Sequence, residues 1–317
     1  MEFVKETFSD KKISRLIIGT LGKTIDKVEE HCKFLDTAFE LGYTCLDTAA
    51  GYGSEPTIGE WMSRRKNRED VFLITKCAHP SRIRTRVTPY DIESDLEDSL
   101  VNLKTDYIDL FLLHRDDESK PVRMVVDLMN RFYEEGKIRA YGGSNWSAKR
   151  IEEANVYAAS KGLKGFAASS PNYSLAEQID EPWAPGCVSI SGPAEAGQRK
   201  IYIKTQMPVM AYSSLARGLL SGKISREQFL NHPEEINEPC RIGYCCDANF
   251  TRLERAKELA QKYKVSIPQI ALAFILNSDL NVYPIVGAMN REEMQDNIDA
   301  LDIKLTAEEM KYLDLEI

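Results

Sequence analysis

The chain has 317 residues, of which 43% are hydrophobic and 28% are charged, and its formal net charge is −8. This is the composition of a globular protein, and the negative net charge argues against a general nucleic-acid-binding or membrane-binding surface. The charged N-terminus has no signal-like apolar core, and no apolar run approaches the roughly 18 residues that span a bilayer, so neither a signal peptide nor a membrane span is expected.

Short apolar segments recur along the whole chain and predict strands. Residues 2–13 are expected to form a small hairpin, which the first strand follows. The near-continuous apolar character of the eight segments is typical of strands that are buried on both faces, as in a parallel sheet. They are "RLIIGT" (15–20), "YTCLD" (43–47), "VFLITK" (71–76), "YIDLFLLH" (107–114), "RAYGGS" (139–144), "GFAAS" (165–169), "PVMAYS" (208–213) and "NVYPIVG" (281–287).

Segments with helical periodicity lie between the predicted strands. In residues 91–104, Ile92, Leu96, Leu100 and Leu103 share one helix face. Proline or serine marks the start of other helices, and glycine marks the end of some of them. These further helices are predicted over residues 121–137, 147–162, 251–264 and 266–277.

The alternation of strand and helix predicts one particular fold class. Eight strand–helix units in about 290 residues indicate a (β/α)8 TIM barrel, with an N-terminal β-hairpin, and residues 1–317 are expected to form a single domain. No GxGxxG follows a strand, which disfavours a Rossmann domain. The connections 174–207 and 222–249 are longer than a bare barrel needs and are expected to be long functional loops at the C-terminal face.

Four titratable residues follow the ends of neighbouring predicted strands. Asp47 ends the second strand, Tyr52 lies in the loop behind it, Lys76 ends the third strand, and His114 ends the fourth. Each one alone has an ordinary structural explanation: a helix cap, a packed tyrosine, a solvated lysine or a core histidine. Because active sites of barrels gather at the C-terminal ends of the strands, their combination predicts a shared site.

These four residue types suit the protonation of a carbonyl oxygen. An ammonium group beside a phenol lowers the pKa of the phenol, and a carboxylate can hold the ammonium in place through a charge-assisted hydrogen bond. An imidazole nearby can donate a hydrogen bond to the carbonyl oxygen. The glycines on either side of Tyr52 leave its hydroxyl accessible to a substrate.

Several separate motifs, in order, resemble those of the aldo-keto reductases along essentially the whole chain. They are "LDTAAGYG" (46–53), "LITK", "DYIDLFLLH", "GGSNW", "NYSLAE", "AYSSLARGLLSGK" and "VGAMNREEMQDNIDAL". The resemblance implies that Tyr52 is the acid/base, that Lys76 and Asp47 tune it, and that His114 orients the carbonyl. It also implies a nicotinamide cofactor that is bound extended across the barrel mouth.

The same resemblance assigns residues to the cofactor. It implies that the carboxamide is held by Ser144 and Asn145, that Tyr212 stacks on the nicotinamide ring, and that Asn297 faces the adenine. Ser170 stands where the family usually has a glutamine, so the carboxamide contact is expected to be lost or bridged by water. The remaining implied cofactor residues are Ser213, Leu215, Arg217 and Gly218 at the pyrophosphate, and Gly287 and Arg291 in the loop after the eighth strand.

NADPH is the expected cofactor, with NADH as an alternative. Relatives that prefer NADPH often carry basic residues in the last loop, but here Met289 and Asn290 follow Ala288, and Glu293 stands where a basic residue often lies. A carboxylate repels a 2′-phosphate, so the NADPH preference is predicted to be weaker than is typical of the family.

The predicted reaction is the reduction of an aldehyde or ketone to an alcohol. Arg115, Asp116 and Asp117 follow His114 and favour a hydroxylated, sugar-like carbonyl, unless they serve to cap the next helix. Trp183, Cys187 and Tyr244 are candidate pocket walls or simply core and surface residues. The protein is expected to be a monomer or weak homo-oligomer that binds a small-molecule carbonyl compound.

Two other function classes compete with this reaction. A metal-dependent barrel hydrolase would need several histidine and acidic ligands at strand ends, but only His114 ends a strand. A non-catalytic nucleotide-binding barrel subunit would not need the four-residue constellation.

The seven cysteines include no CxxC pair, which is typical of a reduced cytoplasmic protein. The cluster of Cys240, Cys245 and Cys246 fits no standard metal site, so no metal is expected.

Overall fold

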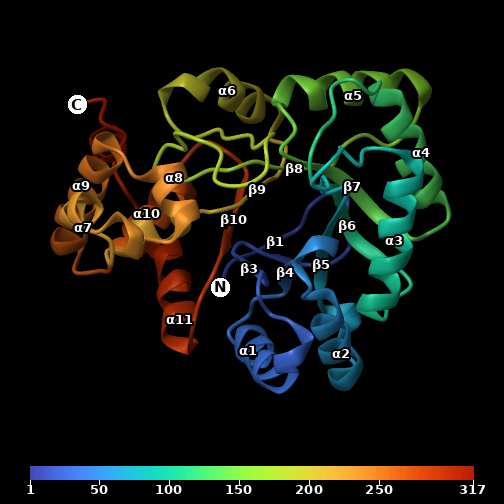
Figure 1. Ribbon diagram of the computed structural model, residues 1–317, viewed down its shortest axis with the longest axis horizontal. Helices are drawn as coiled ribbons and strands as arrows, with labels where there is room; N and C mark the ends of the chain where they lie inside the picture. Colours follow the sequence, from blue (N-terminus) through green and yellow to red (C-terminus); the bar gives the residue numbers. More distant parts are fainter. The chain divides into compact units, whose positions relative to one another are not determined.

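In the computed structural model, which describes residues 1–317, eight parallel strands close into a barrel in the order β10-β3-β4-β5-β6-β7-β8-β9 (Figure 1). All eight overlap the predicted segments, which confirms the (β/α)8 fold. The strands are β3 (Ile17–Gly19), β4 (Cys45–Asp47), β5 (Phe72–Cys77), β6 (Ile108–Leu113), β7 (Ile138–Ser144), β8 (Ala168–Ser170), β9 (Val209–Ala211) and β10 (Val282–Val286).

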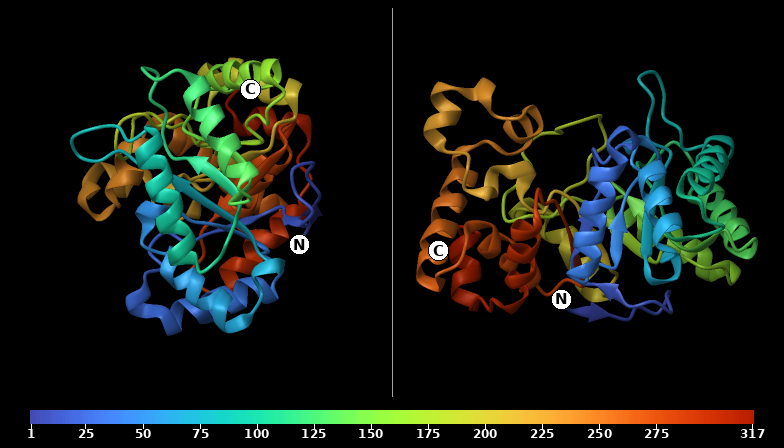
Figure 2. Two further views of the ribbon diagram at one scale, coloured as in Figure 1. Left: turned by 90° about the vertical axis from the view of Figure 1, so that its right-hand side faces the viewer. Right: turned by 90° about the horizontal axis from the view of Figure 1, so that it is seen from below.

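The predicted N-terminal hairpin is also present. Strands β1 (Phe3–Val4) and β2 (Ile13–Ser14) pair antiparallel, with Phe3 opposite Ser14. Just before β2, Lys11 donates through Nζ to the backbone oxygen of Val71 at 2.7 Å and forms an ion pair of 2.9 Å with Asp109 of β6. These contacts anchor the hairpin at the N-terminal ends of β5 and β6. The right-hand view in Figure 2 shows the hairpin near the N-terminus of the chain. The opposite, C-terminal ends of the strands stay clear of it.

The chain divides into two compact units, residues 1–170 and 171–317, which are described separately. Figure 1 shows the helices of the first unit along the outside of its strands. They are α1 (Val28–Glu40), α2 (Glu55–Arg65), α3 (Pro89–Leu103), α4 (Val122–Glu134) and α5 (Ala148–Lys161), with the 3₁₀ helices η1 (Ile25–Lys27), η2 (Ala50–Tyr52) and η3 (Arg68–Asp70).

Capping residues fix the ends of the helices in the first unit. Thr88 caps α3 by accepting a hydrogen bond from the backbone of Asp91, and Ser147 caps α5 in the same way. Gly162 ends α5 in the left-handed conformation with φ of 67°, which glycine adopts without steric cost. All six residues of β6 are buried, as the continuous apolar run predicts.

The second unit contains two of the predicted helices and several others. Helix α10 begins with a capping box between Ser266 and Gln269, and α9 covers the predicted helix 251–264. The helices are α6 (Ala196–Thr205), α7 (Arg226–Asn231), α8 (Glu238–Tyr244), α9 (Asp247–Tyr263), α10 (Ile267–Leu276), α11 (Arg291–Asp299) and α12 (Ala307–Leu313), with η4 (Pro193–Glu195), η5 (Ala216–Ser221), η6 (Pro233–Glu235) and η7 (Ala300–Asp302).

The two connections that the sequence predicts as long loops contain short helices. Helix α6 lies in the connection 174–207, and α7 and α8 lie in the connection 222–249. For α6 and α7 the weak apolar periodicity explains the difference, since Tyr202 is the one buried residue of α6 and α7 buries none. No helix of the structure combines the length and apolar character that a membrane span requires.

Candidate active site

The loop after β4 is held rigidly by buried hydroxyl groups. The Ser54 hydroxyl lies 2.8 Å from that of Thr48 and 3.1 Å from that of Thr20, and Thr20 also donates to the backbone oxygen of Asp47. Gly53 ends η2 with φ of 69°, a conformation that favours glycine. These contacts fix Asp47 at the end of β4 and Tyr52 at the end of η2.

Asp47 and Lys76 form a buried ion pair. Lys76 Nζ lies 2.5 Å from Asp47 Oδ1 and donates a second hydrogen bond of 2.9 Å to the backbone oxygen of Thr48. The side chains of Lys76 and Asp47 are only 2% and 5% exposed. The parallel pairing of β4 with β5 brings the two residues to the same end of the barrel, although Lys76 is the penultimate residue of its strand rather than the last.

Tyr52 lies against this ion pair. The Lys76 Nζ atom is 5.1 Å from the centroid of the Tyr52 ring, which is within the range of a cation–π contact. Burial acts to lower the pKa of Lys76, but the charge of Asp47, the interaction with Tyr52 and the hydrogen bond to Asp47 outweigh it and raise that pKa. The lysine is therefore held as an ammonium ion beside the phenol.

The expectation that Tyr52 is a stronger acid than an ordinary tyrosine is not met. Burial raises the pKa of Tyr52, and the lowering effect of Lys76 offsets this only in part, while Asp47 adds to the rise. Burial likewise raises the pKa of Asp47, against the opposing effect of Lys76. The phenol is thus fully protonated at neutral pH, which is the form that a proton donor requires.

His114 follows β6 and faces Tyr52. The two ring centroids are 5.6 Å apart in an edge-to-face arrangement, and the His114 backbone N–H donates to the backbone oxygen of Cys77. Burial, followed by the charge of Lys76, holds the pKa of His114 well below its usual value, so the imidazole is neutral at pH 7. Its buried Nδ1 atom has no hydrogen-bond partner in the protein. The structure therefore brings all four predicted residues together in the first unit.

Three predicted cofactor residues lie at the ends of β7 and β8 in the first unit. The Ser144 hydroxyl donates to the backbone oxygen of Ser170 at 2.9 Å, and Asn145 donates through Nδ2 to the backbone oxygen of His114 at 3.0 Å. Asn145 has φ of 58°, an uncommon value for a residue other than glycine. The Ser170 hydroxyl is buried without a hydrogen-bond partner in the protein, so it is available to a ligand.

The second unit carries a run of strained backbone after β9. Ser213, Ala216, Arg217 and Gly218 all have positive φ values, of 52°, 49°, 56° and 102°. Ser214 secures this run by donating to the backbone oxygens of Ala211 and Ile285. Successive backbone N–H groups in such conformations can form an anion-binding concavity, and persistent strain is typical of functional sites.

Several other predicted residues accompany this run. Tyr212, directly before it, donates through its backbone to Pro171 at 3.2 Å, and its ring lies 6.0 Å from that of Trp183. Leu215 is the N-terminal neighbour of η5, and the buried Nε atom of Arg217 has no hydrogen-bond partner in the protein. The guanidinium of Arg217 lies 5.3 Å from the centroid of the Trp183 ring.

The loop between β10 and α11 holds the last predicted cofactor residues. Gly287 is exposed and has no atom within 4 Å of where a Cβ would stand, and its carbonyl accepts from the buried Asn297 at 3.3 Å. Arg291 is exposed at the start of α11. The carboxylate of Glu293 accepts a hydrogen bond of 2.9 Å from the backbone of Met289 and forms an ion pair of 3.4 Å with the exposed Lys223, so a carboxylate whose charge is offset in part lies at this helix N-terminus.

The residues that favoured a sugar-like substrate are engaged with other protein groups. Asp116 forms an ion pair of 3.0 Å with Arg150, and Asp117 accepts hydrogen bonds from Thr85 and Ser119. Neither acid caps α4, whose N-cap is Pro121. These two carboxylates therefore do not support the prediction of a hydroxylated, sugar-like substrate.

The remaining candidate pocket walls have different environments. Trp183 is 39% exposed, whereas Tyr244 is buried and its hydroxyl accepts a hydrogen bond from Asn172. Cys187 is partly exposed, and all seven cysteines are free thiols. The group of His232, Glu234 and Glu235 has ligand atoms within 4.8 Å of one another, but all three side chains are exposed and none belongs to the four-residue site.

One residue at the site was not singled out from the sequence. The ring of His79, in the loop after β5, lies edge to face with that of His114, with centroids 4.7 Å apart. The sequence feature that could have indicated its place at the site is its position, three residues after Lys76 and directly before a proline. The contact depends on the course of an irregular loop, which residue spacing does not specify.

Comparisons with known proteins show which family the chain matches. The model of the aldo/keto reductase family matches residues 15–315. The chain is 30% identical over 311 residues to the aldo-keto reductase str7 of Strobilurus tenacellus, covering 96% of this chain and 85% of that protein. It is 26% identical over 300 residues to a probable aryl-alcohol dehydrogenase, AAD4, of Saccharomyces cerevisiae, covering 90% and 87% of the two chains.

Two solved structures share the fold over almost the whole chain. The thermostable aldo-keto reductase Tm1743, in complex with the inhibitor epalrestat, aligns with a TM-score of 0.74 at 27% identity and covers 99% of each chain. The glycerol dehydrogenase AKR11B4 of Gluconobacter oxydans aligns with a TM-score of 0.76 at 23% identity, covering 98% of this chain and 94% of that one.

Proposed function

The chain belongs to the aldo/keto reductase family of oxidoreductases, and from this premise we propose that it reduces an aldehyde or ketone to an alcohol with NADPH or NADH. The observation that carries the proposal is the buried Lys76–Asp47 ion pair beneath the Tyr52 ring, with a neutral His114 beside it. A protonated phenol, a fixed ammonium and an imidazole donor together suit proton delivery to a carbonyl oxygen.

We propose that Tyr52 is the proton donor. The Tyr52 hydroxyl and a His114 N–H would both donate hydrogen bonds to the carbonyl oxygen, which polarises the carbonyl carbon. As that carbon is reduced, the Tyr52 proton passes to the oxygen, and the phenolate left behind is stabilised by the Lys76 ammonium until solvent reprotonates it. Asp47 keeps the ammonium charged and in place.

A raised pKa does not prevent Tyr52 from acting as a general acid. The oxygen that it protonates becomes an alkoxide, whose conjugate acid is about as weak an acid as water. A phenol with a pKa somewhat above its usual value of about 10 remains a much stronger acid than that alcohol. The Lys76 ammonium limits the rise that burial causes.

The residues present fit a nicotinamide cofactor, which when bound supplies the hydride equivalent. In the first unit, the unpartnered Ser170 hydroxyl, together with Ser144 and Asn145, offers polar groups for the carboxamide. Ser170 would thus contact the carboxamide itself, rather than lose that contact because its side chain is shorter than glutamine. In the second unit, Tyr212 offers an aromatic face, and the run from Ser213 to Gly218, which includes Leu215 and Arg217, offers backbone N–H groups and a guanidinium for the pyrophosphate.

We further propose that the preference for NADPH over NADH is weak. Gly287, Arg291 and Asn297 would serve the adenosine end in the second unit. The Glu293 carboxylate, held by the Met289 backbone at the start of α11, would repel a 2′-phosphate there. A single domain over residues 1–317 and a monomeric or weakly associating state also remain proposals.

The proposed function is tested by cofactor oxidation against small aldehydes, ketoses and keto acids. The purified protein should oxidise NADPH or NADH in the presence of at least one class of carbonyl compound. Tyr52→Phe should lower kcat by about a thousandfold, since general acid catalysis contributes about 10²–10⁴-fold, while nucleotide affinity stays near that of the wild type. Normal turnover by this variant would show that Tyr52 is not the proton donor.

Cofactor oxidation and chelation together separate the two other functions from the proposed one. A nucleotide-binding subunit without catalysis would bind NADPH or NADH but reduce no carbonyl compound. A metal-dependent hydrolase would lose its activity on chelation and recover it with added metal. The proposed reductase should be insensitive to chelators.

A further inference from the structure

His79 is a second imidazole at the edge of the four-residue site. It follows the strand that carries Lys76, and its ring packs edge to face on His114 with an interplanar angle of 78°. A methyl group in place of the Gly51 hydrogen would lie 3.9 Å from His79 Cγ, so the backbone beside Tyr52 also borders this ring. His79 is partly exposed, whereas His114 is buried. His79 therefore combines contact with the buried His114 ring with partial exposure to solvent.

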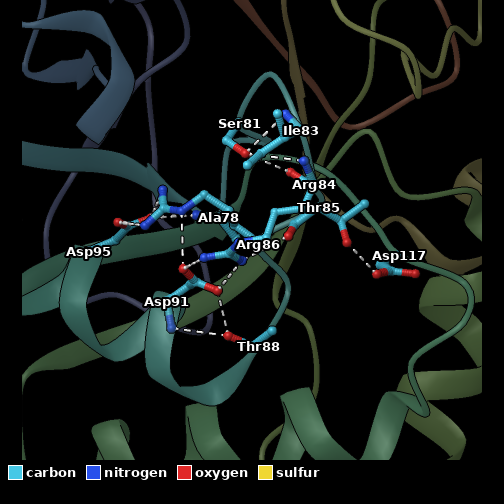
Figure 3. Close-up of polar contacts among 10 residues, drawn as sticks. All are labelled: Ala78, Ser81, Ile83, Arg84, Thr85, Arg86, Thr88, Asp91, Asp95 and Asp117. Atoms are coloured by element: carbon cyan, nitrogen blue, oxygen red, sulfur yellow. Dashed lines mark hydrogen bonds and ion pairs between the residues drawn. The ribbon is translucent and has the colours of Figure 1, made fainter.

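The loop that carries His79 is held by an acidic anchor on α3. Asp95 accepts from the backbone N–H of Ala78 at 2.8 Å and from both terminal nitrogens of Arg86. Asp91 accepts a two-point interaction from Arg84, at 2.7 and 2.8 Å (Figure 3). Charge-assisted hydrogen bonds of this kind fix orientation strongly.

A strained residue adjoins this anchor. Ala78 has φ of 58°, a conformation that non-glycine residues rarely adopt and that surrounding structure must maintain. On the far side of the loop, Thr85 donates to Asp117 at 2.7 Å, as Figure 3 also shows. Because the chain is secured on both sides of His79, the position of the ring is set by the fold.

The hydrogen bonds of His79 define its tautomer. Its Nδ1 atom lies 3.0 Å from the backbone oxygen of Pro80, which can only accept, so Nδ1 carries the proton. Burial lowers the pKa of His79, and the charges of Arg115 and Arg86 act in the same direction, against the Pro80 hydrogen bond and Asp95. The ring is thus neutral at pH 7, and its Nε2 atom is a hydrogen-bond acceptor.

We propose that His79 Nε2 accepts a hydrogen bond from a hydroxyl group next to the reacting carbonyl, so that the site selects hydroxyaldehydes and hydroxyketones. This inference rests on the proposed reductase function and adds the substrate class. In the proposed reaction Tyr52 and His114 both donate to the carbonyl oxygen, which leaves the proton of a neighbouring hydroxyl without an acceptor from these two residues. His79 supplies the acceptor that such a hydroxyl needs, in a place bordered by both Gly51 and His114.

A hydrogen-bonding role predicts discrimination that a packing role does not. A site built to bind a hydroxyl group rejects the analogue that lacks it, because the polar group of the site is left without a partner. A ring that only supports His114 would affect all substrates alike. The test is therefore the ratio of two kcat/KM values, for substrates that differ by a single hydroxyl group.

The experiment compares lactaldehyde with propanal in the wild type and in three variants. His79→Phe keeps an aromatic ring against His114 but removes the acceptor, His79→Gln keeps a polar acceptor, and His79→Ala removes both. We expect the wild type to favour lactaldehyde at least about tenfold, and His79→Phe to bring the ratio close to one, mainly through loss of activity on lactaldehyde. His79→Gln should retain part of the preference.

The possible outcomes separate this inference from the proposed function. Nucleotide affinity and the melting temperature of each variant serve as folding controls, and the ratio is read only from variants that match the wild type in both. A wild-type ratio near one, or an unchanged ratio in His79→Phe, would overturn the role of His79 while leaving the reductase function intact. Absence of carbonyl reduction by the wild type would overturn both.

Discussion

The two units of the chain prepare their functional groups in different ways. The first unit, residues 1–170, sets side chains against one another, as in the buried Lys76–Asp47 pair and the ring contacts of His114. The second unit, residues 171–317, sets its backbone, as in the positive φ values from Ser213 to Gly218. Proton transfer depends on the identity of particular side chains, whereas anion binding can be achieved by N–H groups that every residue except proline has.

This difference predicts which property a substitution in each unit should change. In the first unit the side-chain charge should decide both stability and chemistry, and in the second unit the backbone conformation should decide nucleotide affinity. The predictions below test this contrast, each with a matched control substitution.

The strongest test is removal of the buried ammonium. Lys76→Met should lower the free energy of unfolding by about 3–5 kcal/mol, because it leaves the Asp47 carboxylate buried without a partner. Adding Asp47→Asn should recover part of the loss. The measurement is urea unfolding of the wild type, both single variants and the double variant.

A matched control for this test lies on the surface of the same unit. Lys104 and Glu60 form an ion pair with the same 2.5 Å separation, but their side chains are 48% and 28% exposed. Lys104→Met should therefore change the free energy of unfolding by less than about 1 kcal/mol. Equal losses for the two lysines would contradict the claim that burial distinguishes the Lys76 pair.

The neutral state of His114 should make the first unit sensitive to acid. The folded protein keeps His114 unprotonated below pH 6.5, its ordinary pKa, while the unfolded chain takes up a proton there. The contribution of His114 to the free energy of unfolding is thus fully present above that pH. As the pH falls below it, this contribution decreases by up to about 1.4 kcal/mol per pH unit. In unfolding measurements over this range, His114→Gln should flatten the slope.

A second histidine provides the control for the pH measurement. His232 lies in the second unit with its side chain 62% exposed, so His232→Gln should leave the slope as it is in the wild type. If His114→Gln retained the full slope, titration of other groups would account for the acid sensitivity, and His114 would not be the group that resists protonation.

The fold and the four-residue site could be predicted because they depend on regular patterns. The buried run in β6 has the same apolar character on both faces, and Asp47 and Lys76 meet because parallel strands end at one face. The contact of His79 could not be predicted, since it depends on the Ala78 turn and on carboxylates of α3. The pKa of Tyr52 rose rather than fell because burial, which the sequence does not report, exceeds the effect of Lys76.

The backbone of the second unit is tested by Gly218→Ala. Gly218 has φ of 102°, with no atom within 4 Å of the new methyl group, so the substitution strains the backbone without a steric clash. Strain of this kind costs about 1–3 kcal/mol, and relaxation of the loop should weaken nucleotide binding about tenfold with little change in kcat. Fluorescence titration with NADPH and NADH measures the affinity.

The control for Gly218→Ala is the same substitution in a helix. Gly197 lies in α6, has a helical backbone and no atom within 4 Å of the added methyl group. Gly197→Ala should leave nucleotide affinity unchanged and stabilise the protein slightly, since alanine is the better helix former by about 1 kcal/mol. A Gly218→Ala variant with unchanged affinity would remove the strained run from the cofactor site.

The smallest expected effect concerns the negative charge that we place near the 2′-position of the cofactor in the second unit. Glu293→Gln keeps an oxygen that can accept from the Met289 backbone but removes the negative charge, so the ratio of kcat/KM for NADPH over NADH should rise about fivefold, in line with the roughly 1 kcal/mol of charge effects at a helix terminus. Glu292→Gln, one residue earlier in the same helical turn, should change the ratio less, since its side chain is exposed. A wild-type preference for NADPH of about a thousandfold would already reject the idea, because a carboxylate at the 2′-phosphate position is incompatible with such selectivity. An intermediate preference that Glu293→Gln leaves unchanged would instead locate the 2′-position away from Glu293, and this carboxylate would then play no part in the choice of cofactor.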